Sequence, residues 1–192
     1  MVVFVLVLCY HNSMLRRSLI TLIVFFGLIF SLVFTSSLFA QTINLTQEKV
    51  VYDLPYPGMT PDSPLYIFKN IRDRVTILLT RDDVKKAQLY LLLSDKRMAM
   101  ALLLSKTGKN TLTVSTLSKG EKYFVQIPPL LAAAKKQGNS ATPEFINKLK
   151  VSNAKHREVI ESLLQELPQG ETAIMNDILK LNQEIRLQLE RL

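Results

Sequence analysis

Cysteine, tryptophan and histidine are almost missing from this chain of 192 residues. It has one cysteine, no tryptophan and two histidines, and of these only His156 lies beyond Ala40. Disulfide frameworks, thiol nucleophiles and cysteine or multi-histidine metal sites are therefore excluded from the later part of the chain. The 152 residues after Ala40 are enough for one domain with its own core.

Charge of one sign is not massed in any segment. Apart from Arg16 and Arg17, the chain has 22 basic and 16 acidic residues, which gives this part a net charge of +6. Lys and Arg are interspersed with Asp and Glu, as on an ordinary solvated surface. Nucleic acid is not an expected partner, because there is neither a basic run nor a recognition motif.

One long apolar run decides where the protein is expected to work. Residues 18–40 contain no ionisable side chain, and as a helix they would roughly span a ~30 Å hydrocarbon core. Arg16 and Arg17 precede the run, so the positive-inside rule predicts that everything after Ala40 is exported. We expect an extracytoplasmic domain, either anchored to the cytoplasmic membrane or secreted after signal cleavage.

The nature of residues 14–40 stays open between a signal peptide and a transmembrane anchor. Leu38-Phe39-Ala40 is an imperfect cleavage pattern, whereas the apolar run is longer than a typical signal core. Residues 1–13 lack a positive charge, while Met14 begins a well-formed basic start. We therefore expect Met14 to be the true start and residues 1–13 to be mis-assigned or disordered.

The apolar periodicity after residue 60 is helical throughout and favours an all-α fold. We expect about five amphipathic helices in an up-down bundle or an array of helical hairpins. Residues 41–60, interrupted by Pro55, Pro57 and Gly58, are predicted to be a linker. A helical core over residues 61–137 and a C-terminal helical hairpin over residues 138–192 should follow.

The first two helices have recognisable starts. Asp62 or Ser63 is predicted to cap a helix that begins at Pro64 and runs to residue 79. Its apolar residues recur every three or four positions and predict one buried stripe, made of Leu65, Phe68, Ile71, Val75, Leu78 and Leu79. Thr80 is predicted to cap the second helix, which ends before Gly108 and should be the most buried.

The remaining helices are delimited by proline and glycine. A third helix begins near Asn110 and must be kinked or divided by Pro128-Pro129 before it ends at residue 136. Thr142 is predicted to cap a helix over residues 143–167, and another follows over residues 171–192. Their inward stripes, the second of which includes Ile174, predict an antiparallel hairpin.

No convergent set of polar residues points to catalysis, so we predict a protein that is not an enzyme and needs no cofactor or metal. Asp82 and Asp83 are adjacent carboxylates, but successive helical residues diverge by about 100°. His156 lies on the apolar stripe of the fourth helix. We expect a core or interface histidine with satisfied ring nitrogens, and the alternative is a pH-sensitive contact.

Two basic surfaces are candidates for binding. Lys85, Lys86, Lys96 and Arg97 of the second helix form a possible interaction surface for an anionic wall polymer or lipid. On the first helix, aromatic residues beside Lys69, Arg72 and Arg74 could form an amphipathic face that lies on a membrane, although Asp62 and Asp73 dilute its positive charge.

Several motifs together resemble a bacterial family called domain of unknown function 5667. They are Pro57-Gly58-Met59-Thr60, Pro61-Asp62-Ser63-Pro64-Leu65-Tyr66, Leu79-Thr80-Arg81-Asp82, Lys85-Lys86-Ala87 and Asp95-Lys96-Arg97-Met98-Ala99, before Gly108. The resemblance covers about residues 56–124. It implies an exported helical protein and transfers no catalytic residue. Pro128-Pro129 departs from the continuous third helix expected of the family.

A looser resemblance is to one tetratricopeptide repeat. The second and third helices, joined at Gly108, have Ala99, Ala101, Tyr123 and Phe124 in suggestive places, but no second copy follows at a fixed period. The leading hypothesis is thus a non-catalytic module of the cell envelope that binds an unidentified protein partner. Self-association through the last two helices, a tetratricopeptide-like adaptor, and binding of anionic polymer or lipid remain alternatives. A further membrane contact would run through residues 18–40, if these are not cleaved.

Overall fold

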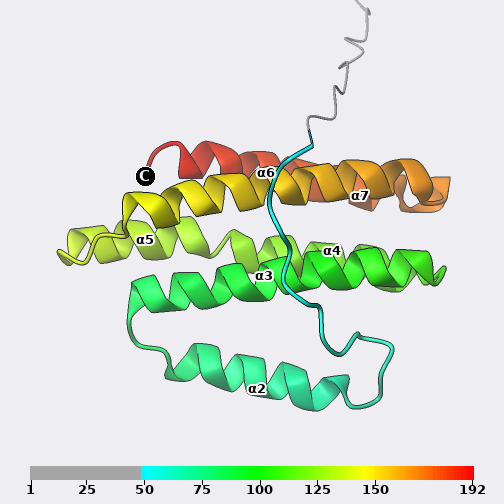
Figure 1. Ribbon diagram of the computed structural model, residues 1–192, viewed down its shortest axis with the longest axis horizontal. Helices are drawn as coiled ribbons and strands as arrows, with labels where there is room; N and C mark the ends of the chain where they lie inside the picture. The colour runs from blue at the N-terminus through cyan, green and yellow to red at the C-terminus, as the bar shows by residue number, and fades with distance from the viewer. Residues whose placement is uncertain (1–48) are drawn as a thin grey trace, which may run out of the picture. The chain divides into compact units, whose positions relative to one another are not determined.

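A computed structural model describes residues 49–192, and the predictions for residues 1–13, 14–40 and 41–48 lie outside this range. Every regular element in the described range is a helix, which confirms the all-α class. In chain order they are α2 (Tyr66–Leu79), α3 (Asp83–Lys106), α4 (Asn110–Phe124), α5 (Ile127–Lys136), α6 (Pro143–Glu166), the short 3₁₀-helix η2 (Gln169–Glu171) and α7 (Thr172–Leu189) (Figure 1). None of these helices is both long and apolar enough to cross a membrane.

The helix starts follow local hydrogen bonding. Thr142 caps α6 as predicted, since its Oγ1 accepts a hydrogen bond from the Phe145 N–H at 3.3 Å. The cap of α3 is Asp82 rather than Thr80, because Asp82 Oδ1 accepts from the Lys85 N–H at 2.8 Å. An aspartate cap also places negative charge at the positive end of the helix dipole.

The first helix begins later than predicted. Pro64 lies in a turn, α2 starts at Tyr66, and no side chain caps it, so the predicted caps Asp62 and Ser63 are wrong. The Tyr66 N–H instead bonds to the Ser63 carbonyl at 3.0 Å within this turn.

The predicted break in the third helix is confirmed, but it lies before the two prolines. α4 ends at Phe124 and α5 begins at Ile127, so Pro128 and Pro129 occupy the first turn of α5. A helix leaves its first N–H groups without intrahelical acceptors, so proline removes no helical hydrogen bond there.

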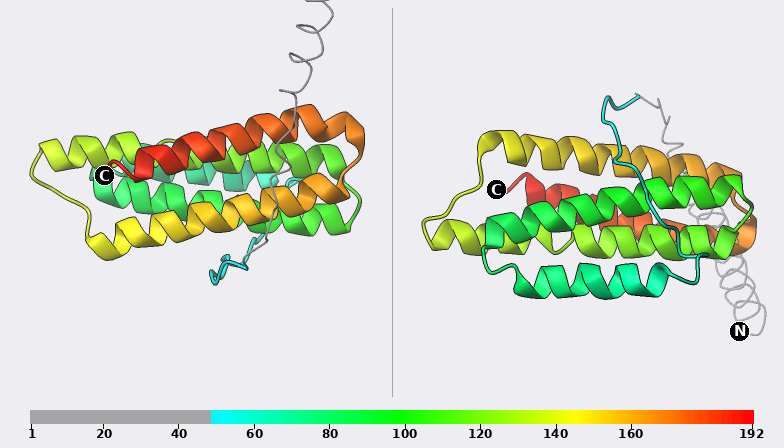
Figure 2. Two further views of the ribbon diagram at one scale, coloured as in Figure 1. Left: turned by 90° about the horizontal axis from the view of Figure 1, so that it is seen from above. Right: turned by 60° about the horizontal axis from the view of Figure 1, so that its bottom comes forward.

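The chain reverses direction between α3 and α4, between α5 and α6, and between α6 and α7 (Figures 1 and 2). α4 and α5 lie in succession along α3, and α6 and α7 form the predicted antiparallel hairpin. The hairpin packs on α3, α4 and α5, while α2 lies on the outer side of α3. Residues 47–192 form one compact unit, which contains all the helix contacts described above and should fold without residues 1–46.

Two apolar clusters fill the bundle, one on each side of its middle. The first joins α3, α4, α6 and α7 and consists of Met98, Ala101, Val114, Leu117, Val159, Ile160, Leu163, Met175 and Ile178. The second joins these helices and α5 and consists of Ala87, Leu91, Phe124, Ile127, Leu131, Leu149, Ile185 and Leu189. The most stable part of the protein is therefore the bundle without α2.

The predicted buried stripe of α2 is wrong. All six of its residues are exposed, with Leu78 at 80% as the extreme, whereas Tyr66 and Asp73 are the buried residues of this helix. The physical reason is that α3 presents polar partners to α2, so the polar side of α2 turns inward. Ile174 of α7 is also half exposed, contrary to prediction, whereas Ile178 and Ile185 are buried.

Gly120 sets the close approach of α4 to α3. A Cβ at this position would lie 2.7 Å from Met98 Cε and 3.4 Å from Arg97 Cβ, in a packed interior. We predict that Gly120→Val lowers the free energy of unfolding of residues 47–192 by about 2 kcal/mol, because the branched side chain overpacks this contact. Urea denaturation measures the change.

Gly170→Val is the matched control, since no atom lies within 4 Å of a Cβ built there. Equal effects of the two substitutions would contradict the close α3–α4 packing.

Candidate functional site

A layer of polar side chains separates the two apolar clusters at the middle of the bundle. Each of the four long helices contributes at least one buried member to this central polar layer, which consists of Asp95 of α3, Glu121 of α4, Ser152, Asn153 and His156 of α6, and Asn182 of α7. In each helix these polar positions lie between core residues of the first cluster and core residues of the second. The layer therefore requires one particular alignment of all four helices.

His156 is the centre of the layer. Its Nδ1 lies 2.8 Å from Glu121 Oε1 and its Nε2 lies 3.0 Å from Asp95 Oδ1, and the ring is fully buried. Burial alone lowers the pKa of His156, but the hydrogen bonds to Asp95 and Glu121 outweigh it and raise the pKa to about 9. Both ring nitrogens thus donate to carboxylates, and the histidine is a buried cation at neutral pH.

Asp95 connects the layer to the segment that precedes α2. Its Oδ1 accepts from Ser152 Oγ at 2.6 Å, and its Oδ2 accepts from the Tyr52 hydroxyl at 2.6 Å. Burial opposes ionisation of Asp95, but the hydrogen bonds from His156, Ser152 and Tyr52 prevail and lower its pKa. Burial and the neighbouring Asp95 raise the pKa of Tyr52, so its proton stays in the hydrogen bond.

Two asparagines tie α6 to α7 next to His156. Asn153 Nδ2 donates to the Asn182 carbonyl at 3.3 Å, and Asn182 Nδ2 donates to the Asn153 carbonyl at 3.2 Å. Asn182 also lies 3.4 Å from Glu121 Oε2. The second carboxylate of the layer therefore has a neutral donor in addition to His156.

The layer contains serine, histidine and aspartate, but their arrangement is not that of a nucleophilic triad. Ser152 donates to Asp95 and not to His156, and all three side chains are closed off from solvent. A triad needs the histidine to accept the serine proton at a site that substrate can reach. Among residues 49–192 there is also no group of three or more histidine, cysteine or carboxylate side chains placed to hold a metal.

The segment before α2 crosses the outside of the bundle next to this layer. The Val50 N–H donates to Glu158 Oε2 at 2.8 Å, and Lys155 Nζ lies 3.5 Å from the Val50 carbonyl. With the bond from Tyr52 to Asp95, these contacts fix the middle of the predicted linker, residues 50–52, to α3 and α6.

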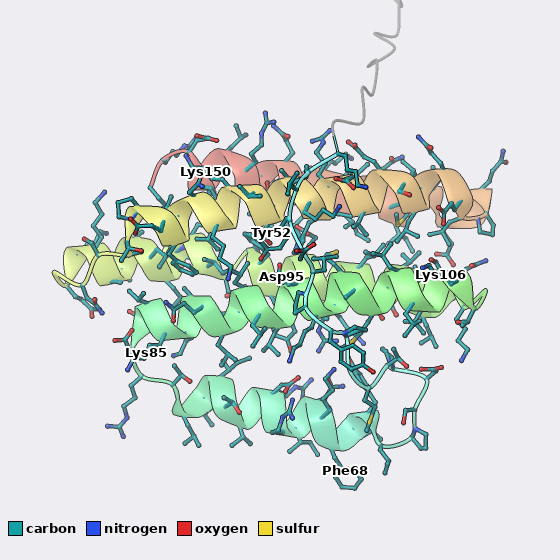
Figure 3. The ribbon with its side chains drawn as sticks, viewed as in Figure 1. Tyr52, Phe68, Lys85, Asp95, Lys106 and Lys150 are labelled. Atoms are coloured by element: carbon teal, nitrogen blue, oxygen red, sulfur yellow. The ribbon has the colours of Figure 1, made fainter. Side chains whose placement is uncertain are left out.

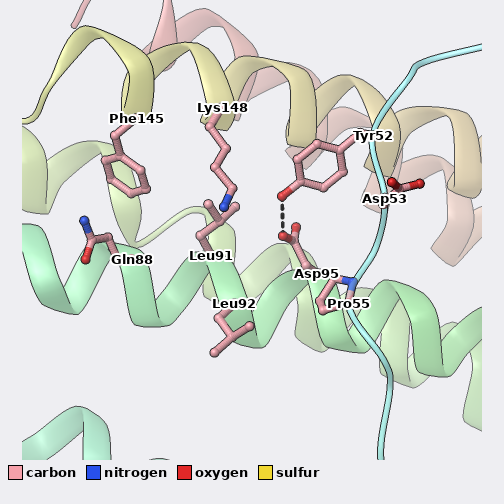
Figure 4. Close-up of a pocket in the computed structure, with 9 residues that line it drawn as sticks. All are labelled: Tyr52, Asp53, Pro55, Gln88, Leu91, Leu92, Asp95, Phe145 and Lys148. Carbon is pink, nitrogen blue, oxygen red and sulfur yellow. Dashed lines mark hydrogen bonds between the residues drawn. The ribbon is translucent and has the colours of Figure 1, made fainter.

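Next to Tyr52 lies an open cleft of about 400 Å³. Figure 4 shows Leu91 and Leu92 of α3 on one side, Phe145 and Lys148 of α6 on the other, and Tyr52 pointing inward to Asp95. Tyr52 and Asp95 in this cleft are already bonded to each other, and its other polar side chains are Asp53, Gln88 and Lys148.

A second candidate surface is the outer face of α2, defined by Leu65, Ile67, Phe68, Ile71, Val75, Leu78 and Leu79, all of which are exposed. Figure 3 shows Phe68 pointing away from the rest of the bundle. Large apolar side chains gathered on one exposed helix face are unusual in monomeric soluble proteins and mark an interaction site.

The four residues of the predicted basic surface on α3 do not share one exposed face. Lys85 is exposed at the first turn of α3, and Lys86 and Lys96 are partly exposed. Arg97 is buried, only 4% exposed, and is not part of any outer basic face. The reason is that Arg97 lies on the side of α3 that faces α2 and α4.

Arg97 makes the contacts that hold α2 in place. Its Nη1 donates to the Tyr66 hydroxyl, and its Nη2 lies 3.2 Å from Asn70 Oδ1 and 3.4 Å from the Tyr123 hydroxyl. The guanidinium also lies 4.9 Å from the centre of the Tyr123 ring, within cation–π range. The polar residues of α2 thus face α3, and the apolar residues of α2 face away from the bundle.

The partners of His156 were missed at the sequence level, although a signal exists. Asp95 lies between Leu91 and Met98, at spacings of four and three on the buried stripe of α3. Glu121 and Asn182 occupy the same kind of position, so one polar residue interrupts each apolar stripe at the same level. Aligning the helices at these interruptions would have predicted that the three polar residues lie together in the core.

Residues 58–170 match a family model described as Domain of unknown function (DUF5667). The match extends well past Phe124, where the resemblance seen in the sequence ends, and includes α2 to α6. No curated protein and no solved structure matches the chain.

The high pKa of His156 predicts a pH-dependent stability. The folded-state pKa of about 9 exceeds the unfolded value of 6.5, so this stabilisation is complete below pH 6.5 and is lost as the pH rises toward 9. We predict that the free energy of unfolding of residues 47–192 falls by about 1 kcal/mol between pH 6.5 and 7.5. Burial lowers the pKa of Lys69 to about 8. Lys69 therefore makes the free energy of unfolding rise with pH, but mainly above pH 8.

Urea denaturation and an NMR titration of His156, the one histidine in residues 47–192, measure these quantities. Asp95→Asn should lower the histidine pKa, whereas Glu184→Gln, an exposed carboxyl on α7, should not. A His156 that titrates below pH 6.5 in the wild type would contradict the charged layer.

Proposed function

The chain belongs to the family of domain of unknown function 5667, and we propose that it is a non-catalytic module of the bacterial cell envelope that lies on an anionic membrane surface through the outer face of α2. The observation that carries the proposal is the inverted packing of this helix. Tyr66, Asn70 and Asp73 face the bundle, while the apolar residues of α2 face away from it.

The charges of α2 complement an anionic surface. Asp73 is the one acidic residue of α2, and it is 5% exposed on the inner side of the helix. Arg74 is exposed, as are Arg81 and Lys85 just beyond the end of the helix. Arg72 is also exposed, but it is paired with Asp73 at 2.7 Å and adds no net charge to this surface. Apolar side chains bordered by arginine and lysine are typical of helices that lie in a membrane interface.

The position of α2 in the chain supports the same proposal. The apolar run that predicts export ends at Ala40, and only the 25 residues from Gln41 to Leu65 separate it from α2. Val50 and Tyr52 within this connection are bonded to α6 and α3. If the run stays in the membrane, the nine residues from Gln41 to Lys49 therefore keep the whole bundle, including α2, at a high effective concentration near the bilayer. A weak surface contact would then be sufficient.

The proposal of a non-catalytic role rests on how the polar groups of the interior are used. His156, Asp95, Glu121 and Ser152 are buried and hydrogen-bonded to one another. They hold the bundle together, and a substrate would have to break this network to reach them.

A protein partner and a second copy of the chain are the competing occupants of the outer face of α2. The apolar residues of α6 and α7 that the alternative of self-association would use, such as Leu163 and Ile185, pack inside their own chain. An interface built on apolar contact would therefore also have to use α2.

Binding of residues 47–192 to lipid vesicles tests the proposal. We predict binding to vesicles of phosphatidylglycerol and phosphatidylcholine, weakened by salt, and at least tenfold weaker binding to phosphatidylcholine alone. The triple substitution Phe68→Ser, Ile71→Ser and Leu78→Ser should weaken binding at least tenfold, because about 1 kcal/mol or more is lost with each apolar group. Vesicle co-sedimentation measures the partitioning.

The matched control is Leu92→Ser, Leu103→Ser and Leu187→Ser, which removes three exposed leucines from α3 and α7. This control should bind as the wild type does. Equal losses in both triple variants, or no binding to either vesicle, would contradict the membrane proposal. A dimer in sedimentation that only the α2 variant abolishes would assign the face to a second copy.

A further inference from the structure

A basic pocket lies between α2 and α4, beside α3. Asn70 and Arg74 of α2, Arg97 of α3, and Lys119, Lys122 and Tyr123 of α4 line it. Its volume is about 190 Å³, several times the ~30 Å³ that a water molecule occupies in the liquid. The pocket therefore has room for a small polyatomic group.

The guanidinium of Arg97 has no carboxylate partner in the described part of the chain. Its hydrogen-bond acceptors are the Tyr66 hydroxyl, Asn70 Oδ1 and the Tyr123 hydroxyl, all of them neutral. Its buried Nε has no acceptor among the described residues. Because a buried charge is normally paired, the positive charge of Arg97 calls for an anion.

The rest of the pocket increases this requirement. Arg74, Lys119 and Lys122 are exposed at its edge and add three more positive charges, while no acidic residue is among those that line it. His156 shows the contrast within the same protein, since that buried cation has a carboxylate at each ring nitrogen. The residues that line the pocket have the reverse balance, with four cations and no anion.

We propose that this pocket binds a phosphate group, either free phosphate or the phosphate ester of a lipid headgroup. Several oxygens on one tetrahedral centre can accept from arginine and lysine donors that approach from different helices, and the negative charge would neutralise Arg97. Asn70 and Tyr123 supply neutral polar groups at the same site. A bound phosphate would link α2 to α4 and add to the hold of Arg97 on α2.

The pocket is separate from the membrane contact proposed above. The pocket is formed by side chains at the junction of α2, α3 and α4, whereas the membrane contact uses the apolar residues on the outer face of α2. The two surfaces border each other, because Ile71 and Leu78 lie three and four positions from Arg74 on the helix. A phospholipid on the outer face could thus place its headgroup in the pocket.

Titration of residues 47–192 with inorganic phosphate at constant ionic strength tests the inference. We expect saturable binding by calorimetry, with chloride unable to replace phosphate, and a shift of the Arg97 Nε–H signal in NMR spectra. Lys119→Gln together with Lys122→Gln should weaken binding by tenfold or more, since two charge-assisted contacts are lost. These lysines are exposed, so the fold should persist.

Lys106→Gln together with Lys136→Gln is the matched control, because it removes the same charge from exposed positions at the ends of α3 and α5. Unchanged affinity in this control supports the pocket, whereas an equal loss, or no saturable binding in the wild type, overturns it. The soluble headgroup glycerophosphoglycerol is the second probe. Tighter binding of this diester than of inorganic phosphate identifies the lipid as the source, and the reverse identifies free phosphate. Failure here with intact vesicle binding would remove the pocket and leave the membrane proposal standing.

Discussion

The buried guanidinium of Arg97 decides what this protein presents to its surroundings. It lies between three helices, donates to Tyr66 and Asn70 of α2, and packs against the Tyr123 ring of α4. A surface helix normally turns its apolar side to the core. In α2 the polar side faces the bundle instead, because it supplies hydrogen-bond acceptors to the buried Arg97. The same charge that orients α2 also needs an anion. One residue therefore connects the exposed apolar face and the phosphate pocket.

The bundle behind α2 is specified by a second buried charge. His156, between Asp95 and Glu121, is satisfied only when α3, α4 and α6 are at one relative height, and Asn182 adds α7 to this alignment. Buried ionic groups contribute little net stability compared with apolar packing, but they penalise every other alignment. The apolar clusters supply the stability and the polar layer supplies the register. Together they give α2 a rigid surface on which to be held.

The sequence was a good guide to which segments form helices, although two of its three predicted helix caps were wrong. It predicted the all-α class, the Thr142 cap, the end of α3 at Gly108, the division near Pro128 and the hairpin of α6 and α7. It failed for α2, because periodicity shows that a helix has an apolar side and not which side faces the bundle. That choice depends on Arg97, which lies 31 residues from Tyr66 in the chain. His156 was recognised as a satisfied core residue, but its partners lie on other helices and needed the tertiary structure.

The orientation of α2 is the central claim, and spin labels measure it most directly. Residues 47–192 contain no cysteine, so single cysteines at Phe68, Leu78, Leu103 and Leu187 give four unique label sites. All four should be mobile and water-accessible in the free protein. With phosphatidylglycerol vesicles, labels at residues 68 and 78 should become accessible to oxygen and shielded from a water-soluble nickel chelate, while those at 103 and 187 should not change. Immobile, shielded labels at 68 and 78 in the lipid-free protein would contradict the account, because α2 would then pack with its apolar side inward.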